Sequence, residues 1–74
     1  MGLFAYYVET DIESRLNRLG DFRSFDDACA AARRSLVENP RVAFAVVKDD
    51  NGILVFACDG LREWIRGEGV APIG

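Results

Sequence analysis

The chain contains no histidine. A catalytic Ser–His or Cys–His pair needs an imidazole as its base, so this class of nucleophilic enzyme is excluded within one subunit. Cysteine is also scarce, because the sequence holds only Cys29 and Cys58, and two such ligands without a histidine do not make a zinc site. We expect no metal and no cofactor. Both thiols are expected to be inert and buried, with a disulfide between them as the alternative.

Long apolar runs are also absent. No run approaches the ~20 residues of a membrane-spanning helix. The opening residues MGLFAYYVE lack the basic start of a secretory signal, and Tyr6 stands where an N-myristoylation motif has Ser or Thr. The sequence therefore predicts a cytoplasmic protein with no membrane contact.

Positive charge is in the minority. Nine Lys and Arg against twelve Asp and Glu give a formal net charge of −3, with a pI near 4.7. This balance opposes binding to the nucleic-acid backbone, which requires a basic surface. Arginines gather at Arg15, Arg18 and Arg23 and again at Arg33 and Arg34; we interpret them as solvated faces, with a local basic patch as the alternative.

No pattern typical of a catalytic or ion-binding site is present. The spacing of the carboxylates does not place two of them in an apolar cleft, where acid–base catalysis would require them. Asp49 to Gly52 resembles the start of a calcium loop, but such a loop needs glycine where Leu54 stands and glutamate where Gly60 stands. No catalytic residue is therefore assigned, and we do not expect an enzyme.

Half of the 74 residues are hydrophobic and 28% are charged, as in ordinary globular proteins. A chain of this length makes one domain that buries roughly 60% of its unfolded surface, which gives marginal stability. We expect the domain to cover residues 1–66 and residues 67–74 to form a flexible tail, because Gly67, Gly69 and Pro72 interrupt regular structure.

The segment around Asn51-Gly52 predicts a β-hairpin. Strands over 42–48 and 53–58 flank this dipeptide, which favours a two-residue type I′ turn because it tolerates positive φ at both positions. The expected register pairs Ala45 with Cys58 and Asp50 with Ile53. Both faces of the hairpin are apolar, so the sheet has to be covered on both sides.

The remaining elements follow from composition and capping. Residues 3–9 predict a strand, and residues 16–22 favour a returning strand after an irregular turn, with a short helix over 10–21 as the alternative. Ser24 is a good N-cap for a helix that runs to about Glu38, before Asn39-Pro40. The apolar stripe of this helix should cover the hairpin face that carries Ala43, Ala45, Phe56 and Cys58.

Residues 59–66 predict a short C-terminal helix, with Leu61, Trp64 and Ile65 on one side. The expected fold is a two-layer α+β arrangement, ββαββ, in which a small antiparallel sheet packs on one main helix. The layout is similar to that of many short bacterial domains, but no motif is specific enough to name a family.

One helix leaves the opposite sheet face uncovered, and large exposed apolar patches usually mark interfaces. We expect a non-catalytic interaction module, most readily a homodimer, while a different protein partner or cover by the C-terminal segment stays open. The alternatives are a small-ligand cleft at the dimer seam and a nucleic-acid-binding sheet face built on Tyr6, Tyr7 and Phe44. The expected interface residues are Val42, Phe44, Val46, Ile53, Val55 and Trp64.

Overall fold

The computed structural model describes residues 2–66 and 69–72. The fold is α+β: the first five strands form an antiparallel sheet with one helix in the order ββαβββ, and a sixth strand pairs along the edge of the fifth. The spatial order is β2-β1-β3-β4-β5-β6. No helix in the described ranges is long and apolar enough to cross a membrane. The elements are β1 (Leu3–Glu9), β2 (Ile12–Phe22), α1 (Phe25–Glu38), β3 (Val42–Asp49), β4 (Leu54–Cys58), β5 (Arg62–Ile65) and β6 (Gly69–Pro72).

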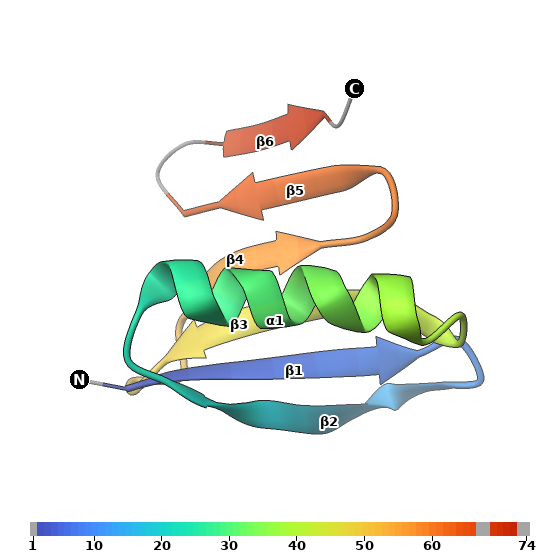
Figure 1. Ribbon diagram of the computed structural model, residues 1–74, viewed down its shortest axis with the longest axis horizontal. Helices are drawn as coiled ribbons and strands as arrows, with labels where there is room; N and C mark the ends of the chain where they lie inside the picture. The colour runs from blue at the N-terminus through green and yellow to red at the C-terminus, as the bar shows by residue number, and fades with distance from the viewer. Residues whose placement is uncertain (1, 67–68, 73–74) are drawn as a thin grey trace.

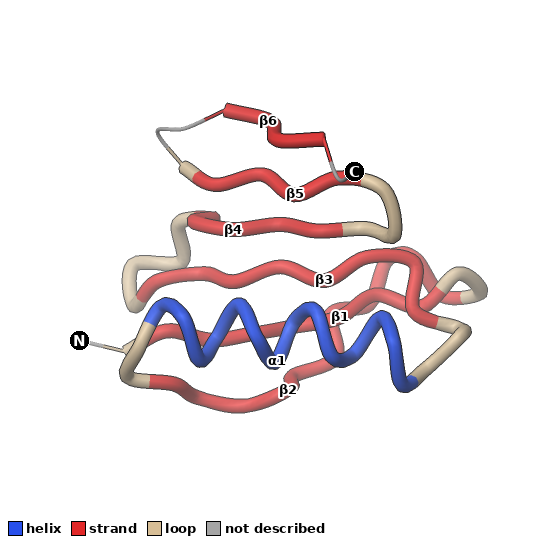
Figure 2. Tube along the Cα trace, turned by 45° about the horizontal axis from the view of Figure 1, so that its top comes forward, coloured by secondary structure: helices blue, strands red, loops and turns tan. Residues whose placement is uncertain are grey.

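The helix lies on one face of the sheet and runs along the strands (Figure 1). It packs against β1 and β3 and, to a smaller extent, against β2 and β4. Strands β5 and β6 extend the sheet beyond the helix, as Figure 2 also shows. The expected two-layer arrangement is therefore present, but α1 covers only part of one face.

The helix begins and ends where its capping residues predict. The Ser24 hydroxyl accepts a hydrogen bond from the Asp27 backbone N–H at 3.4 Å, and the Asn39 N–H donates to the Ser35 carbonyl at 3.1 Å. Ala28, Cys29 and Ala32 are buried, so the helix backbone approaches the sheet closely. The predicted stripe is confirmed, and the core it forms consists of Ala5, Ala28, Cys29, Ala32, Ala45, Val47, Phe56 and Cys58.

The β3–β4 hairpin confirms the predicted strand pairing but not the predicted turn. Ala45 pairs with Cys58 as expected. At the tip, however, the Gly52 N–H donates to the Asp49 carbonyl at 2.9 Å, and the Asp49 N–H donates to the Ile53 carbonyl at 2.9 Å. Gly52 alone has positive φ in this loop, at 78°. The loop therefore has three residues, 50–52, with glycine in the left-handed position, and the expected type I′ turn is wrong.

A β-bulge in β4 reconciles the longer loop with the correct strand register. Val47 pairs with Phe56 while Lys48 pairs with Leu54, which leaves Val55 as the extra residue. A bulge reorients its side chain, and Val55 packs against the buried core on the α1 side. The alternation rule had placed Val55 on the opposite face, and the bulge is the physical reason for that error.

The ambiguous segment after β1 is a strand. β2 begins at Ile12, earlier than the expected strand over 16–22, and it pairs with β1 from Glu9↔Ile12 to Leu3↔Phe22 through two register shifts. The sequential strand provides β1 with a partner on its second edge, since β3 occupies the first. The alternative short helix is excluded.

The predicted C-terminal helix is wrong, because Arg62–Ile65 forms β5. Trp64 pairs with Ala57 and Glu63 with Cys58, so β5 satisfies the open backbone edge of β4. A helix of two turns gains little stability by itself, whereas the ladder to β4 adds several hydrogen bonds at once. Beyond it, Gly69–Pro72 forms β6, so this part of the expected tail is in the sheet. The rest of the tail, residues 67, 68, 73 and 74, lies outside the described residues.

Candidate functional site

The sheet face opposite α1, called here the open face, carries no helix in the part of the chain that the structure describes. Strand register places one row of side chains across it. Tyr6 of β1 pairs with Val46 of β3, Val46 pairs with Ala57 of β4, and Ala57 pairs with Trp64 of β5. Because cross-strand partners project to the same side, these four residues share the open face.

Two cations lie against aromatic rings on the β1 side of this face. The Arg18 guanidinium lies 5.0 Å from the centroid of the Phe4 ring and also pairs with Asp21. The Lys48 ammonium lies 5.9 Å from the centroid of the Tyr6 ring. Such cation–π contacts are favourable, and they place charge over rings that would otherwise be open to solvent. The open face is therefore less apolar than alternation alone predicts.

The six expected interface residues do not form one exposed patch. Val42 and Val46 are buried, and Val55 lies on the α1 side because of the bulge. Phe44 is 37% exposed, and Ile53 is 43% exposed at the hairpin loop. Trp64 is partly buried. Of the six residues, only Phe44 and Ile53 are exposed, and they lie at the two ends of the β3–β4 hairpin.

A groove of about 330 Å³ occupies one of these ends. Ala43 and Phe44 are consecutive residues that both line it, because a register shift between β1 and β3 makes Ala43 the extra residue of a second bulge. A pocket of this size was not expected within a single subunit of 74 residues. The groove is lined by Ala43, Phe44, Ala57, Cys58, Asp59, Arg62 and Trp64.

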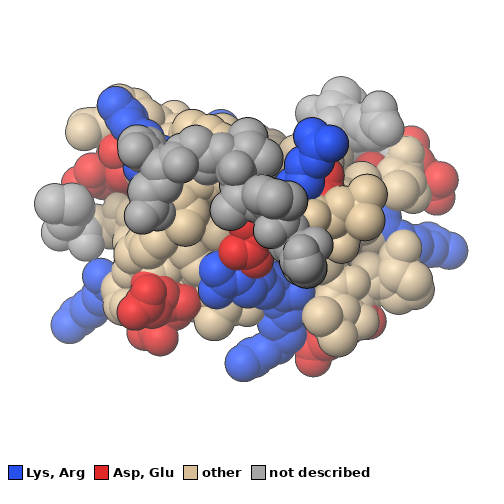
Figure 3. Space-filling view, turned by 90° about the horizontal axis from the view of Figure 1, so that it is seen from above, with Lys and Arg blue, Asp and Glu red and all other residues tan. Residues whose placement is uncertain are grey.

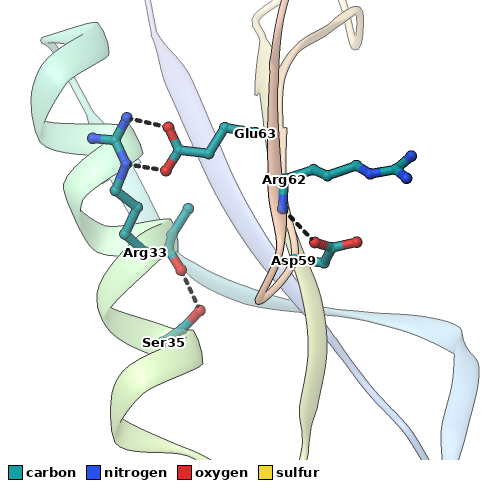
Figure 4. A network of polar contacts seen from close by, with 6 residues as sticks. Arg33, Ser35, Asp59, Arg62 and Glu63 are labelled. Carbon is teal, nitrogen blue, oxygen red and sulfur yellow. Dashed lines mark hydrogen bonds and ion pairs between the residues drawn. The ribbon is translucent and has the colours of Figure 1, made fainter. Parts of the chain in front are cut away.

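The β4–β5 turn fixes the polar wall of the groove. One oxygen of Asp59, Oδ1, accepts hydrogen bonds from the backbone N–H groups of Leu61 and Arg62, each at 2.8 Å. These hydrogen bonds lower the pKa of the Asp59 carboxyl below its usual value. Figure 4 shows that the Arg62 side chain points away from α1, whereas that of Glu63 points toward it.

On the α1 side, Arg33 binds Glu63 through two hydrogen bonds. The guanidinium Nε lies 2.5 Å from one carboxylate oxygen and a terminal nitrogen lies 2.8 Å from the other, as Figure 4 shows. The same guanidinium lies 5.2 Å from the centroid of the Phe56 ring. Arg33 is exposed, as expected, but its pairing with Glu63 was not predicted. The alternation of Glu63 with Trp64 in a strand would have placed the glutamate on this side, but the helix prediction concealed that pattern.

Both cysteines belong to the same buried cluster and are free. Burial is the main cause that raises the pKa of each thiol to about 11. A thiol with this pKa is a poor nucleophile and a poor metal ligand at neutral pH. Within the described ranges, no three Cys, Asp or Glu side chains gather in a geometry that would hold a metal ion.

On the face seen from above in Figure 3, acidic and basic side chains are interspersed. The candidate functional site is therefore the groove beside Phe44 and Trp64, together with the exposed β3–β4 loop.

Comparison with models of protein families, with curated proteins and with solved structures finds no match to this chain.

Proposed function

We propose that the chain is a non-catalytic interaction module that forms a homodimer through its open face. The observation that supports this proposal is the exposure of Phe44, at 37%, beside a groove on the sheet face that carries no helix in the described residues. Exposed aromatic side chains next to a concave apolar surface are typical of protein interfaces.

The geometry of the sheet also suits this role. The described chain extends 31 × 26 × 20 Å, and the sheet lies in the plane of the two longer dimensions (Figure 1). A face of this size can supply the roughly 800 Å² that each partner buries in a standard interface. Trp64 does not fold back over the face, because β5 lies beside β4 within the sheet. Self-covering by this segment was the competing expectation.

The test is the molar mass in solution of Phe44→Glu and of the matched control Val37→Glu. Val37 is 84% exposed on α1 and is remote from the open face. Sedimentation at micromolar concentration should show a dimer for the unaltered chain and the control, and a folded monomer for Phe44→Glu. A monomeric unaltered chain, or a Phe44→Glu variant that stays dimeric, would contradict the proposal.

A second candidate function rests on the cations of the open face. Arg18 and Lys48 stand beside aromatic rings, and Arg62 projects to the same side, although the chain as a whole is acidic. Aromatic rings with interleaved cations are the usual platform for single-stranded nucleic acid. Fluorescence anisotropy with a labelled single-stranded oligonucleotide tests this candidate. Binding that weakens steeply with salt would support it, and no binding at low salt would remove it.

A further inference from the structure

Two of the exposed apolar regions of the described chain lie at opposite ends of the same hairpin. The groove is at the end where β3 begins and β4 finishes, beside Phe44. At the other end, the loop exposes Ile53 at 43% and Leu54 at 36%. Leu54 pairs with Lys48 beyond the bulge, which places it on the open face. On the open face, one end of the hairpin is therefore concave and apolar, and the other end carries the exposed side chain of Leu54.

A two-fold axis converts this arrangement into a self-complementary surface. In an isologous dimer, each copy presents both halves of every contact. An axis that is parallel to the sheet and perpendicular to its strands would place β3 over β3 and β4 over β4, with their directions reversed. The loop of each copy would then lie over the groove of its partner. Packed sheets commonly keep their strand directions within about 30° of each other, which this arrangement allows.

Charge supports the same orientation. Arg62 lines the groove on the side away from α1, and Asp50 is exposed at the loop. Within the described ranges neither Arg62 nor Asp50 belongs to an ion pair, although the charge of Arg62 also acts on Asp59, which lines the same groove. Reversal of the strands brings the Asp50 end of one copy to the Arg62 end of the other, where opposite charges attract.

Resting on the proposed homodimer, we propose that a second copy of the chain docks its β3–β4 loop into the groove. Leu54 of each copy packs against Phe44 and Trp64 of the other, and Asp50 of each copy pairs with Arg62 of the other. The groove is thus a receptor for the partner's loop. The bulge at Ala43 turns two consecutive side chains, Ala43 and Phe44, to the rim of this groove.

A charge-reversal cycle tests this docking. The variants are Arg62→Asp, Asp50→Arg and the double variant, with Arg34→Asp, on the exposed side of α1, as the matched control. The measurement is the dimer dissociation constant from sedimentation, with circular dichroism to verify the fold of each variant. Each single reversal should weaken the dimer about tenfold or more, and the double variant should recover most of that loss. The control should leave the dissociation constant unchanged.

The outcomes separate this inference from the proposed function. If both single variants keep the dissociation constant of the unaltered chain, or if the losses of the two single variants simply add in the double variant, the docking of the loop is overturned and the homodimer stays in place. An unaltered chain that remains monomeric overturns both. A dimer that weakens in the two single variants and recovers in the double variant supports both.

Discussion

The guanidinium of Arg33 on α1 and the carboxylate of Glu63 on β5 form a two-bond ion pair that joins the helix to a strand lying beyond its cover. Of the strands the structure describes, β5 is the outermost one with a side-chain hydrogen bond to α1. This ion pair therefore links α1 to β5, a strand against which the helix does not pack directly.

Loss of the Arg33–Glu63 ion pair should be visible in the pH dependence of stability. The hydrogen bonds from Arg33 lower the pKa of Glu63 below its ordinary value of 4.5. The stabilisation is therefore fully present above about pH 4.5 and is lost as the pH falls through the lower folded-state pKa. Glu63→Gln should lower the free energy of unfolding at pH 7 by about 1 kcal/mol, since the Arg33 side chain is 48% exposed and water screens the pair.

Urea unfolding of the unaltered chain and of Glu63→Gln at several pH values provides the measurement. The difference between the two curves should shrink as the pH falls below 4.5. Asp21→Asn is the control, because its pair with Arg18 is exposed. A difference that is constant from pH 7 to pH 3 would show that the ion pair does not stabilise the fold.

Truncation of Phe56 should be the most damaging change in the core. This side chain is fully buried, and its ring meets that of Phe25 edge to face, with centroids 6.2 Å apart. Phe56→Ala should cost about 3–5 kcal/mol, a large share of the stability of so small a domain. Thermal unfolding by circular dichroism measures the loss, and Phe44→Ala, at the partly exposed Phe44, should cost clearly less. Equal costs at the two positions would argue against Phe56 as the centre of the core.

Gly52 should tolerate alanine less well than Gly60. A Cβ atom added at either glycine meets no atom within 4 Å, so steric contact is not the difference. Gly52 has φ of 78°, in the left-handed region that disfavours residues with a Cβ atom, whereas Gly60 does not have positive φ. Gly52→Ala should therefore cost about 1–2 kcal/mol, and Gly60→Ala should stay within about 0.5 kcal/mol. Chemical denaturation of the two variants compares them directly; equal midpoints would contradict the three-residue loop.

Both thiols should be protected from alkylation in the folded chain. With pKa values of about 11 for Cys29 and Cys58, only about one thiol in a thousand is ionised at pH 8, and burial hinders access as well. Mass spectrometry after iodoacetamide treatment should show little modification in native buffer and complete modification in urea. Rapid labelling of either cysteine without denaturant would show that the core opens readily.

Local signals in the sequence were sufficient for α1 and for most of the β3–β4 hairpin. The hydroxyl of Ser24 and the proline at position 40 act within a few residues of the helix ends, so they fix its limits without reference to the rest of the chain. The apolar pattern of the hairpin likewise predicted the pairing of Ala45 with Cys58. These features depend on backbone conformation over short range.

Only the tertiary structure decided the fate of residues 62–65 and of Val55. The apolar residues of 59–66 do have helical spacing. However, the open edge of β4 and the Arg33 side chain together favour a strand there. Val55 changes face because one bulge compensates for the longer loop, and alternation cannot foresee an inserted residue. Short-range chemistry thus determined which segments become regular, whereas unpaired edges and bulges determined which side chains lie on the open face.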